Sequence, residues 1–202
     1  MPIFEYHQAN PERAQEFTAA MAGLTAMWSL NVADLIDTSG VSVAVDVGGA
    51  NGALLRMLQR ANPVLRGIVF DRPDIAAAVE ADVADDRTEA IGGDFFEAVP
   101  SADLYLLKLV LHDWDDESCV RILRRCREAM KPGGRIVIID SVIGDDADAG
   151  FTAVSDLNML VVAGGKERSL AEFDALLAEA GLQRAALRPT DSPQSIIEAV
   201  AA

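Results

Sequence analysis

Residues 41–52 read Val-Ser-Val-Ala-Val-Asp-Val-Gly-Gly-Ala-Asn-Gly, and the fold class follows from this stretch. Its first half is an apolar, β-branched run, which is typical of a strand buried on both faces. Its second half is a glycine-rich turn, and a helical pattern over residues 53–60 follows directly. A buried strand that leads through glycines into a helix is the opening unit of a parallel α/β sheet.

The same alternation continues along the chain. Apolar runs at 67–70, 104–111 and 135–139 each precede a helical stretch, and 88–91 is a further strand candidate. Two more strand candidates, 183–188 and 195–200, are joined by a loop too short for a crossover, so we expect them to be antiparallel. The sequence therefore predicts an α/β, doubly wound Rossmann-like sheet of about seven strands, mostly parallel, with a C-terminal antiparallel hairpin.

Two local signals set the limits of the last helix. Ser169 and Glu172 have the spacing of a capping box, and Gly181 is a natural stop after Ala180.

With 202 residues, half of them hydrophobic, the chain is expected to form one globular unit. We divide it into an N-terminal helical segment, residues 1–39, that packs on a catalytic domain, residues 40–202.

Charge and composition exclude several classes of binding partner. Seventeen basic residues against 32 acidic ones give a formal net charge of −15, which disfavours nucleic acid and anionic membranes. No apolar run approaches the roughly 18 residues of a membrane span and no signal-peptide pattern begins the chain, so we expect a cytoplasmic location. With two histidines and no cysteine–histidine cluster of zinc spacing, we expect no metal site.

The two cysteines do not predict a disulfide. Cys119 and Cys126 are seven residues apart within a predicted helix, which separates their Cα atoms by roughly 10.5 Å along the axis. We expect both to be small buried thiols.

Acidic residues stand at the carboxyl ends of the predicted strands, where a doubly wound sheet binds its ligand. They are Asp46, Asp71, Asp94 and Asp140, and Lys108 is the one basic residue among them. The glycines of the first turn, Gly48, Gly49 and Gly52, do not have the spacing of a dinucleotide site. Asp46 beside them would also repel a pyrophosphate, whereas it suits a ligand that carries an amino group or a sulfonium.

Three residues after the second and third predicted strands extend the description of the ligand. Asp71, 23 residues after Gly48, is placed to accept hydrogen bonds from both ribose hydroxyls, and Asp94 with Phe95 is placed to hold an adenine. An adenosine without phosphates and with a cationic tail is S-adenosylmethionine. Each feature also has a structural interpretation, because glycine turns occur in many α/β domains and aspartates often cap helices or form turns.

Five blocks of sequence stand in a specific order and spacing. They are Val45-Asp46-Val47-Gly48-Gly49, Phe70-Asp71-Arg72-Pro73, Gly92-Gly93-Asp94-Phe95-Phe96, Leu107-Lys108-Leu109-Val110-Leu111-His112-Asp113-Trp114 and Gly164-Gly165-Lys166-Glu167-Arg168. Together they resemble the small-molecule S-adenosylmethionine-dependent O-methyltransferases. This family includes the plant caffeic acid and flavonoid enzymes, acetylserotonin methyltransferase and bacterial enzymes that tailor polyketides in secondary metabolism. The resemblance runs from about Phe4 to Val200.

The resemblance implies methyl transfer from S-adenosylmethionine, with S-adenosylhomocysteine as product, to a hydroxyl of a small aromatic molecule. It implies His112 as the general base, flanked by Asp140 and Glu167. Trp114 is expected to pack rather than stack on a ligand. The implied substrate contacts are Met21, Asp113 and Met159, and the expected cofactor contacts are Asp46, Gly48, Gly49, Gly52, Asp71, Asp94, Phe95 and Lys108.

The chain departs from the family pattern in three places. Ala50 replaces a glycine of the first turn, and Asp140 stands where the plant enzymes have glutamate. The family also carries an N-terminal domain that makes the dimer and walls part of the substrate pocket, and the present sequence starts after it. A homodimer is therefore expected to be weakened.

Alternatives stay open at this point. The chain could be a non-catalytic or partner-dependent module that binds S-adenosylmethionine, or a family member repurposed for another tailoring reaction. His112 could also be only a helix-entry residue, capped by Asp113 or Asp115. The roles of Asp140 and Glu167 in orienting His112 are likewise not separated by the sequence.

Overall fold

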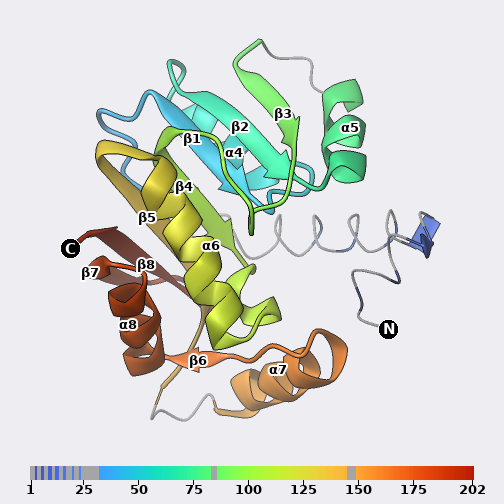
Figure 1. Cartoon of the computed structure of the whole chain (residues 1–202), viewed down its shortest axis with the longest axis vertical. Helices are drawn as coiled ribbons and strands as arrows, with labels where there is room; N and C mark the ends of the chain where they lie inside the picture. Colours follow the sequence, from blue (N-terminus) through green and yellow to red (C-terminus); the bar gives the residue numbers. More distant parts are fainter. Residues whose placement is uncertain are drawn as a thin grey trace.

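The computed structural model describes residues 32–82, 86–144 and 149–202, together with isolated positions between residues 3 and 23 (Figure 1). Within the predicted N-terminal segment it describes one short helix, α3 (Val32–Leu35). Met21 lies outside the described residues, so its predicted substrate contact stays a prediction.

One sheet organises the described residues, in the order β3-β2-β1-β4-β5-β8-β7, with β6 paired to β5. The strand pairs from β3 through β5 are parallel, and β8 runs antiparallel to both β5 and β7. The predicted parallel sheet with a C-terminal hairpin is confirmed. The strands are β1 (Val43–Val47), β2 (Arg66–Asp71), β3 (Thr88–Gly92), β4 (Ala102–Lys108), β5 (Met130–Ile143), β6 (Arg168–Ser169), β7 (Leu182–Pro189) and β8 (Gln194–Ala201).

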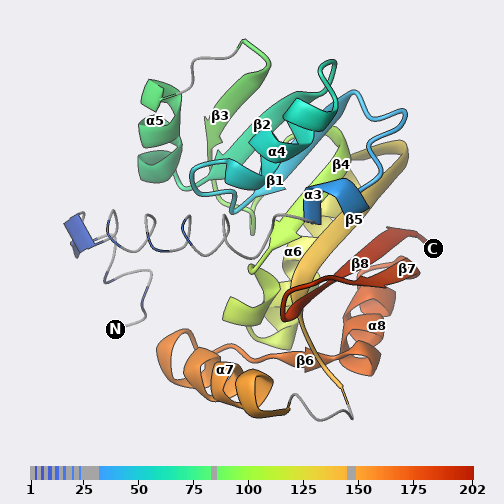
Figure 2. The same ribbon diagram turned by 180° about the vertical axis from the view of Figure 1, so that it is seen from behind.

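Helices cover both faces of the sheet. Figure 1 shows α6 and α8 in front of it, and the reverse view in Figure 2 shows α3 and α4 on the opposite face. Helix α8 begins with the predicted capping box of Ser169 and Glu172. The helices are α4 (Ala53–Ala61), α5 (Pro73–Asp82), the 3-10 turn η1 (Leu111–Asp113), α6 (Asp116–Ala129), α7 (Ala149–Val162) and α8 (Leu170–Glu179).

The two helical layers explain why the central strands are apolar at almost every position. In β4, Leu104 and Leu106 belong to the hydrophobic cluster under α3 and α4, whereas Tyr105 and Leu107 belong to the cluster under α6 and α8. Successive side chains of a strand point to opposite faces, so both sets must be apolar when both faces are covered.

The parallel strands bring the predicted site residues to one edge. Because β1, β2, β4 and β5 are mutually parallel, their carboxyl ends meet there. Asp46, Asp71, Lys108 and Asp140 lie at or near these ends. Helix α7 and β6 lie beside one another beyond this edge (Figure 1).

Candidate functional site

The glycine turn after β1 depends on backbone that side chains rarely allow. Gly48 and Gly52 have φ angles of 66° and 70°, in the left-handed region. A Cβ on Gly49 would lie 2.7 Å from the carboxyl carbon of Asp46 and 2.8 Å from its carbonyl oxygen. The turn thus folds tightly over the end of β1, and the glycines leave its backbone open to close approach by a ligand.

Ala50 is the one non-glycine residue of this turn with a left-handed backbone, at φ 48°. Replacing it with glycine should stabilise the fold by about 1 kcal/mol, because alanine is strained in this region. Chemical denaturation of the variant measures the change. Ala153→Gly, on the exposed side of α7, is the matched control and should cost about 1 kcal/mol, because its backbone is helical. Equal destabilisation by both changes would contradict the strain at Ala50.

Asp71 holds the glycine turn against the end of β2. Its Oδ2 accepts a hydrogen bond from the Ala50 amide at 2.9 Å, and its Oδ1 accepts one from the Arg72 amide at 2.7 Å. Burial raises the pKa of Asp71, and these two amides oppose that rise. The carboxylate is therefore partly a structural group, and it keeps further lone pairs that could accept from a ligand.

Asp94 and Phe95 follow β3. The Asp94 side chain is exposed, and its Oδ1 accepts a hydrogen bond from the Phe96 amide at 2.8 Å, so it also forms a turn. Phe95 is half-buried, and its ring centroid lies 5.9 Å from that of Trp114 in an edge-to-face contact. Trp114 packs against the core cluster, as predicted.

Three ionisable groups lie at or near the carboxyl ends of β1, β4 and β5. Asp46 is buried, and burial raises its pKa to about 7, although Lys108 opposes the rise. Burial lowers the pKa of Lys108, while Asp46 and Asp140 both favour its charged form. Asp140 has no exposed surface, and burial raises its pKa to about 7. Neither carboxyl oxygen of Asp140 has a hydrogen-bond partner among the described residues.

His112 stands in η1, directly after β4, among three carboxylates. Its Nδ1 lies 3.2 Å from Oε1 of Glu167 and 3.8 Å from Oδ1 of Asp140, and its Nε2 lies 3.7 Å from Oδ1 of Asp113. Glu167 is thus the acceptor for Nδ1–H, and Asp140 is a nearby charge. The N-cap of α6 is Asp115, which accepts from the Ser118 amide, so His112 is not held by helix capping.

The carboxylates change the protonation of His112. Burial of the ring lowers its pKa, but Asp140, the hydrogen bond with Glu167 and Asp113 outweigh this effect and raise it from 6.5 to about 9. Burial raises the pKa of Asp113 to about 6, although His112 opposes it. The carboxylates thus favour the charged form of His112.

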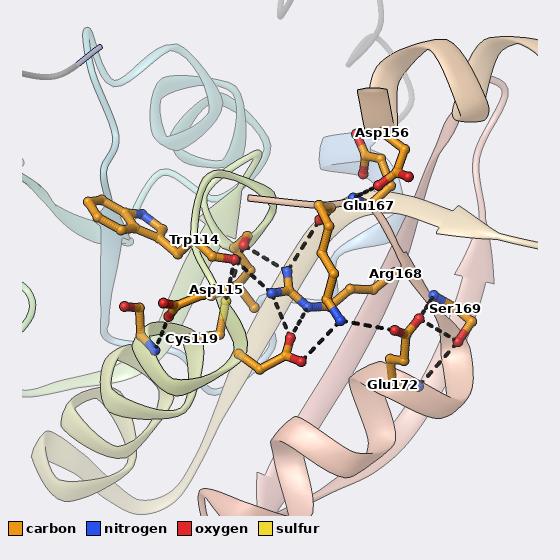
Figure 3. Close-up of polar contacts among 12 residues, drawn as sticks. Trp114, Asp115, Cys119, Asp156, Glu167, Arg168, Ser169 and Glu172 are labelled. Atoms are coloured by element: carbon orange, nitrogen blue, oxygen red, sulfur yellow. Dashed lines mark hydrogen bonds and ion pairs between the residues drawn. The ribbon is translucent and has the colours of Figure 1, made fainter. Parts of the chain in front are cut away.

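Glu167 is itself fixed by α7, and these contacts were missed from the sequence. The Ser155 hydroxyl donates to Oε1 of Glu167 at 2.6 Å. The Glu167 amide donates to Oδ1 of Asp156 at 2.9 Å (Figure 3). Met159 lies one helical turn after Ser155, on the same face of α7. The sequence offered no signal for Ser155 or Asp156, because nothing in it indicates which face of α7 meets Glu167.

This arrangement fits a cationic ligand. Buried carboxylates are normally paired, and here Asp140 and Oε2 of Glu167 have no hydrogen-bond partner within the described ranges. The glycine turn adds open backbone at the same edge. Cys119 and Cys126 are buried, and burial raises the pKa of each thiol to about 12, so neither is a nucleophile at neutral pH.

The part of the chain that the structure describes contains neither a metal-binding group nor a membrane-spanning helix. No group of three or more histidine, cysteine, aspartate or glutamate residues there has an arrangement that could hold a metal ion. None of the helices there has both the length and the apolar character required to span a membrane.

Known proteins with similar sequences share this organisation. Phenazine O-methyltransferase PhzM of Lysobacter antibioticus is 39% identical over 201 residues, covering 97% of this chain and 59% of that protein. The mitomycin biosynthesis 6-O-methyltransferase of Streptomyces lavendulae is 44% identical over 179 residues, covering 86% of this chain and 51% of that protein. The chain thus spans between half and three fifths of the length of these relatives.

A solved structure of NcsB1, an O-methyltransferase from neocarzinostatin biosynthesis, superposes with a TM-score of 0.93 at 38% identity. The superposition covers 100% of this chain and 62% of NcsB1, which was crystallised with S-adenosyl-L-homocysteine and 1,4-dihydroxy-2-naphthoic acid. A family model for the O-methyltransferase domain matches residues 1–183. The chain therefore belongs to the O-methyltransferase domain family.

Proposed function

We propose that this chain transfers a methyl group from S-adenosylmethionine to a phenolic hydroxyl of a small aromatic molecule, with His112 as the general base. The observation that carries the proposal is the contact between Nδ1 of His112 and Glu167. It holds a proton on Nδ1, so that the neutral ring has its lone pair on Nε2. The relatives named above are O-methyltransferases, which supports the same reaction.

The chain offers a place for each part of the cofactor. Asp71 would accept the ribose hydroxyls, and Asp94 with Phe95 would hold the adenine. The buried acids at the ends of β1 and β5 suit a positive charge, and the glycine turn admits the amino acid end. When bound, the cofactor supplies an electrophilic methyl group.

The residues around His112 then position the transfer of one proton from the substrate hydroxyl. Nε2 of His112 accepts the proton of the substrate hydroxyl as the oxygen attacks the methyl carbon. Glu167 keeps Nδ1–H in place, and Ser155 keeps Glu167 in place, so the ring holds one tautomer and one orientation. Asp140 stabilises the imidazolium that forms, because its charge lies 3.8 Å from Nδ1.

A second candidate is a cofactor-binding module without turnover. One observation favours it: a His112 with a pKa of about 9 is protonated at neutral pH and cannot accept a proton in that form. Incubation with methyl-labelled S-adenosylmethionine and a panel of catechols and hydroxyquinones, at pH 7 and at pH 9, separates the two. Labelled product supports the enzyme. Cofactor binding by calorimetry without product at either pH would contradict it.

The pH dependence of methyl transfer should follow His112. The neutral ring is the active form, so kcat/KM should rise about tenfold from pH 7 to pH 8 and level off near pH 9. An NMR titration of the imidazole in the free chain measures the same group directly. Glu167→Gln removes one cause of the raised pKa and should move both midpoints to lower pH. A wild-type midpoint near the ordinary 6.5 would contradict the effect of the carboxylates.

The cellular setting is also part of the proposal. We infer a cytoplasmic enzyme of secondary metabolism, supported by the buried free thiols Cys119 and Cys126, which are typical of a reducing compartment.

Val154, Leu157 and Val161 expose apolar side chains along α7, which supports self-association into a homodimer. Light scattering measures the mass in solution.

A further inference from the structure

Arg168 is a charged side chain with no exposed surface. Its NH1 donates to the carbonyl oxygen of Leu111 at 2.9 Å, and its NH2 donates to the carbonyl oxygen of Trp114 at 2.7 Å (Figure 3). Its Nε donates to Oδ1 of Asp116 at 3.0 Å, and a longer bond reaches the Lys166 carbonyl at 3.4 Å. Burying a guanidinium is costly, and here the cost is offset by a nearly complete set of acceptors.

Two of these contacts are made on either side of His112 in the chain. Leu111 and Trp114 bracket His112 and Asp113 in the chain, so Arg168 holds the backbone on both sides of the imidazole. Arg168 is also the residue after Glu167, whose carboxylate accepts from Nδ1 of His112. One side chain, at the first residue of β6, therefore ties the segment that carries His112 to the residue directly after its acceptor Glu167.

The surrounding backbone shows how closely these segments meet. The Lys166 amide donates to the His112 carbonyl oxygen at 3.0 Å. A Cβ on Gly165 would overlap that same oxygen and would come within 2.8 Å of the Trp114 nitrogen. Only a glycine lets the segment before Glu167 lie against the turn that bears His112.

We propose that Arg168 is a positioning residue for proton transfer: its guanidinium fixes the turn 111–114 against β6, so that Nδ1 of His112 stays on Glu167. This inference rests on the proposed function and names a residue that acts on the base from outside the reacting atoms. The guanidinium fork suits the task, because it presents donors to several acceptors in one plane. A lysine ammonium keeps the charge but is a single point with a different reach.

The ion pair with Asp116 does not by itself explain the arginine. Asp116 is partly exposed, and it is also bound by Nζ of Lys166 at 3.0 Å, so it keeps a cation without Arg168. The Leu111 carbonyl likewise accepts from the Cys119 thiol at 3.1 Å. The Cys119 thiol also lies 3.6 Å from the Trp114 carbonyl oxygen, but it comes from α6. Among the described residues, the link from β6 to both carbonyls of the His112 turn comes from Arg168.

The test is Arg168→Lys in the 202-residue chain, which keeps the positive charge and removes the fork. We expect kcat to fall by about 10²-fold with little change in cofactor affinity, because a small misplacement of a catalytic group has an effect of that size. The NMR midpoint of His112 should fall from about 9 toward 6.5, since the ring loses its fixed contact with Glu167. With only His7 and His112 in the chain, a His7→Gln background leaves one imidazole to follow.

A purely structural role predicts a different pattern. Leu177→Ala, on the buried face of α8, should lower the free energy of unfolding without moving the His112 midpoint, and it is the matched control for lost stability. Arg168→Lys with an unchanged midpoint and unchanged kcat would overturn the inference. Removing the positive charge of Arg168 would relieve its repulsion with protonated His112, and this would raise the pKa of His112. A lost charge therefore cannot explain a lowered midpoint.

A second variant covers the case in which Arg168→Lys does not fold. Combining Arg168→Met with Asp116→Asn removes both charges, and apolar replacement of a buried ion pair is often tolerated. This variant loses the same carbonyl contacts, so the same fall in kcat and midpoint is expected, and wild-type values would overturn the inference. The midpoint of the NMR titration of His112 can be measured in a chain that does not turn over substrate. A lowered midpoint in a chain that methylates nothing therefore supports the positioning role and contradicts only the proposed reaction.

Discussion

Replacing His112 with alanine should lower kcat for methyl transfer by about 10²- to 10⁴-fold and leave the dissociation constant of S-adenosylmethionine nearly unchanged. His112 is the imidazole placed between Asp113, Asp140 and Glu167, so its replacement removes the proposed proton acceptor. The ligand features assigned to the cofactor lie on the glycine turn and at the ends of β2 and β3, which the substitution leaves in place.

Calorimetric titration with the cofactor, run beside single-turnover methyl transfer, separates the two effects. Glu167→Gln is the companion variant: it keeps the imidazole but weakens its orientation, so its loss of kcat should be smaller. The midpoint of the pH dependence of Glu167→Gln should also move to lower pH. Loss of cofactor binding together with turnover in His112→Ala would contradict the role of a base and indicate that His112 supports the cofactor site instead.

Replacing Asp71 with alanine should raise the dissociation constant of S-adenosylmethionine by about 10- to 100-fold, which corresponds to about 1.5–3 kcal/mol for hydrogen bonds to a charged group. Part of this effect arises before the ligand binds, because Asp71 also accepts from the Ala50 amide and holds the glycine turn. Asp71→Asn keeps one oxygen acceptor, so we expect it to fall between wild type and alanine.

Asp74→Ala is the matched control for Asp71. Asp74 is an exposed carboxylate three residues further on, and it pairs with Arg72 at the surface. Its removal takes the same charge from the same region without touching the glycine turn, so cofactor affinity should stay close to wild type. Unchanged affinity in Asp71→Ala would remove this residue from the site, and equal weakening in both variants would show that only the general negative charge matters.

Much of the fold could be predicted because its signals are local. The run Leu104 to Leu107 is apolar at every residue, since side chains on both faces of β4 are covered. The capping box of Ser169 and Glu172 begins α8, as predicted. The short loop between β7 and β8 allows only a hairpin, and the structure confirms their antiparallel pairing. Patterns of this kind depend on the backbone geometry of one element and its immediate neighbours.

The candidate site was predictable only in part. Parallel strands end at one edge, so the positions of Asp46, Asp71 and Asp140 near that edge followed from the topology. Two of the predicted cofactor residues, Asp71 and Asp94, turned out to have structural bonds as well, to the Ala50 and Phe96 amides. The sequence carries the residue types, but it does not show how many of a carboxylate's lone pairs are already used.

The contacts of the base were decided by tertiary packing. Glu167 reaches Nδ1 of His112 across a separation of 55 residues, whereas Asp140 stops at 3.8 Å. Ser155, which holds Glu167, carries no signal in the linear chain. Arg168 stands in the block 164–168 of the family resemblance, but nothing in that block indicates that it binds the His112 turn. Periodicity and turn chemistry determine elements and their order, because they act over a few residues. Hydrogen-bond partners are selected within a fraction of an ångström, and only the packing of α7, β6 and η1 against one another sets those distances.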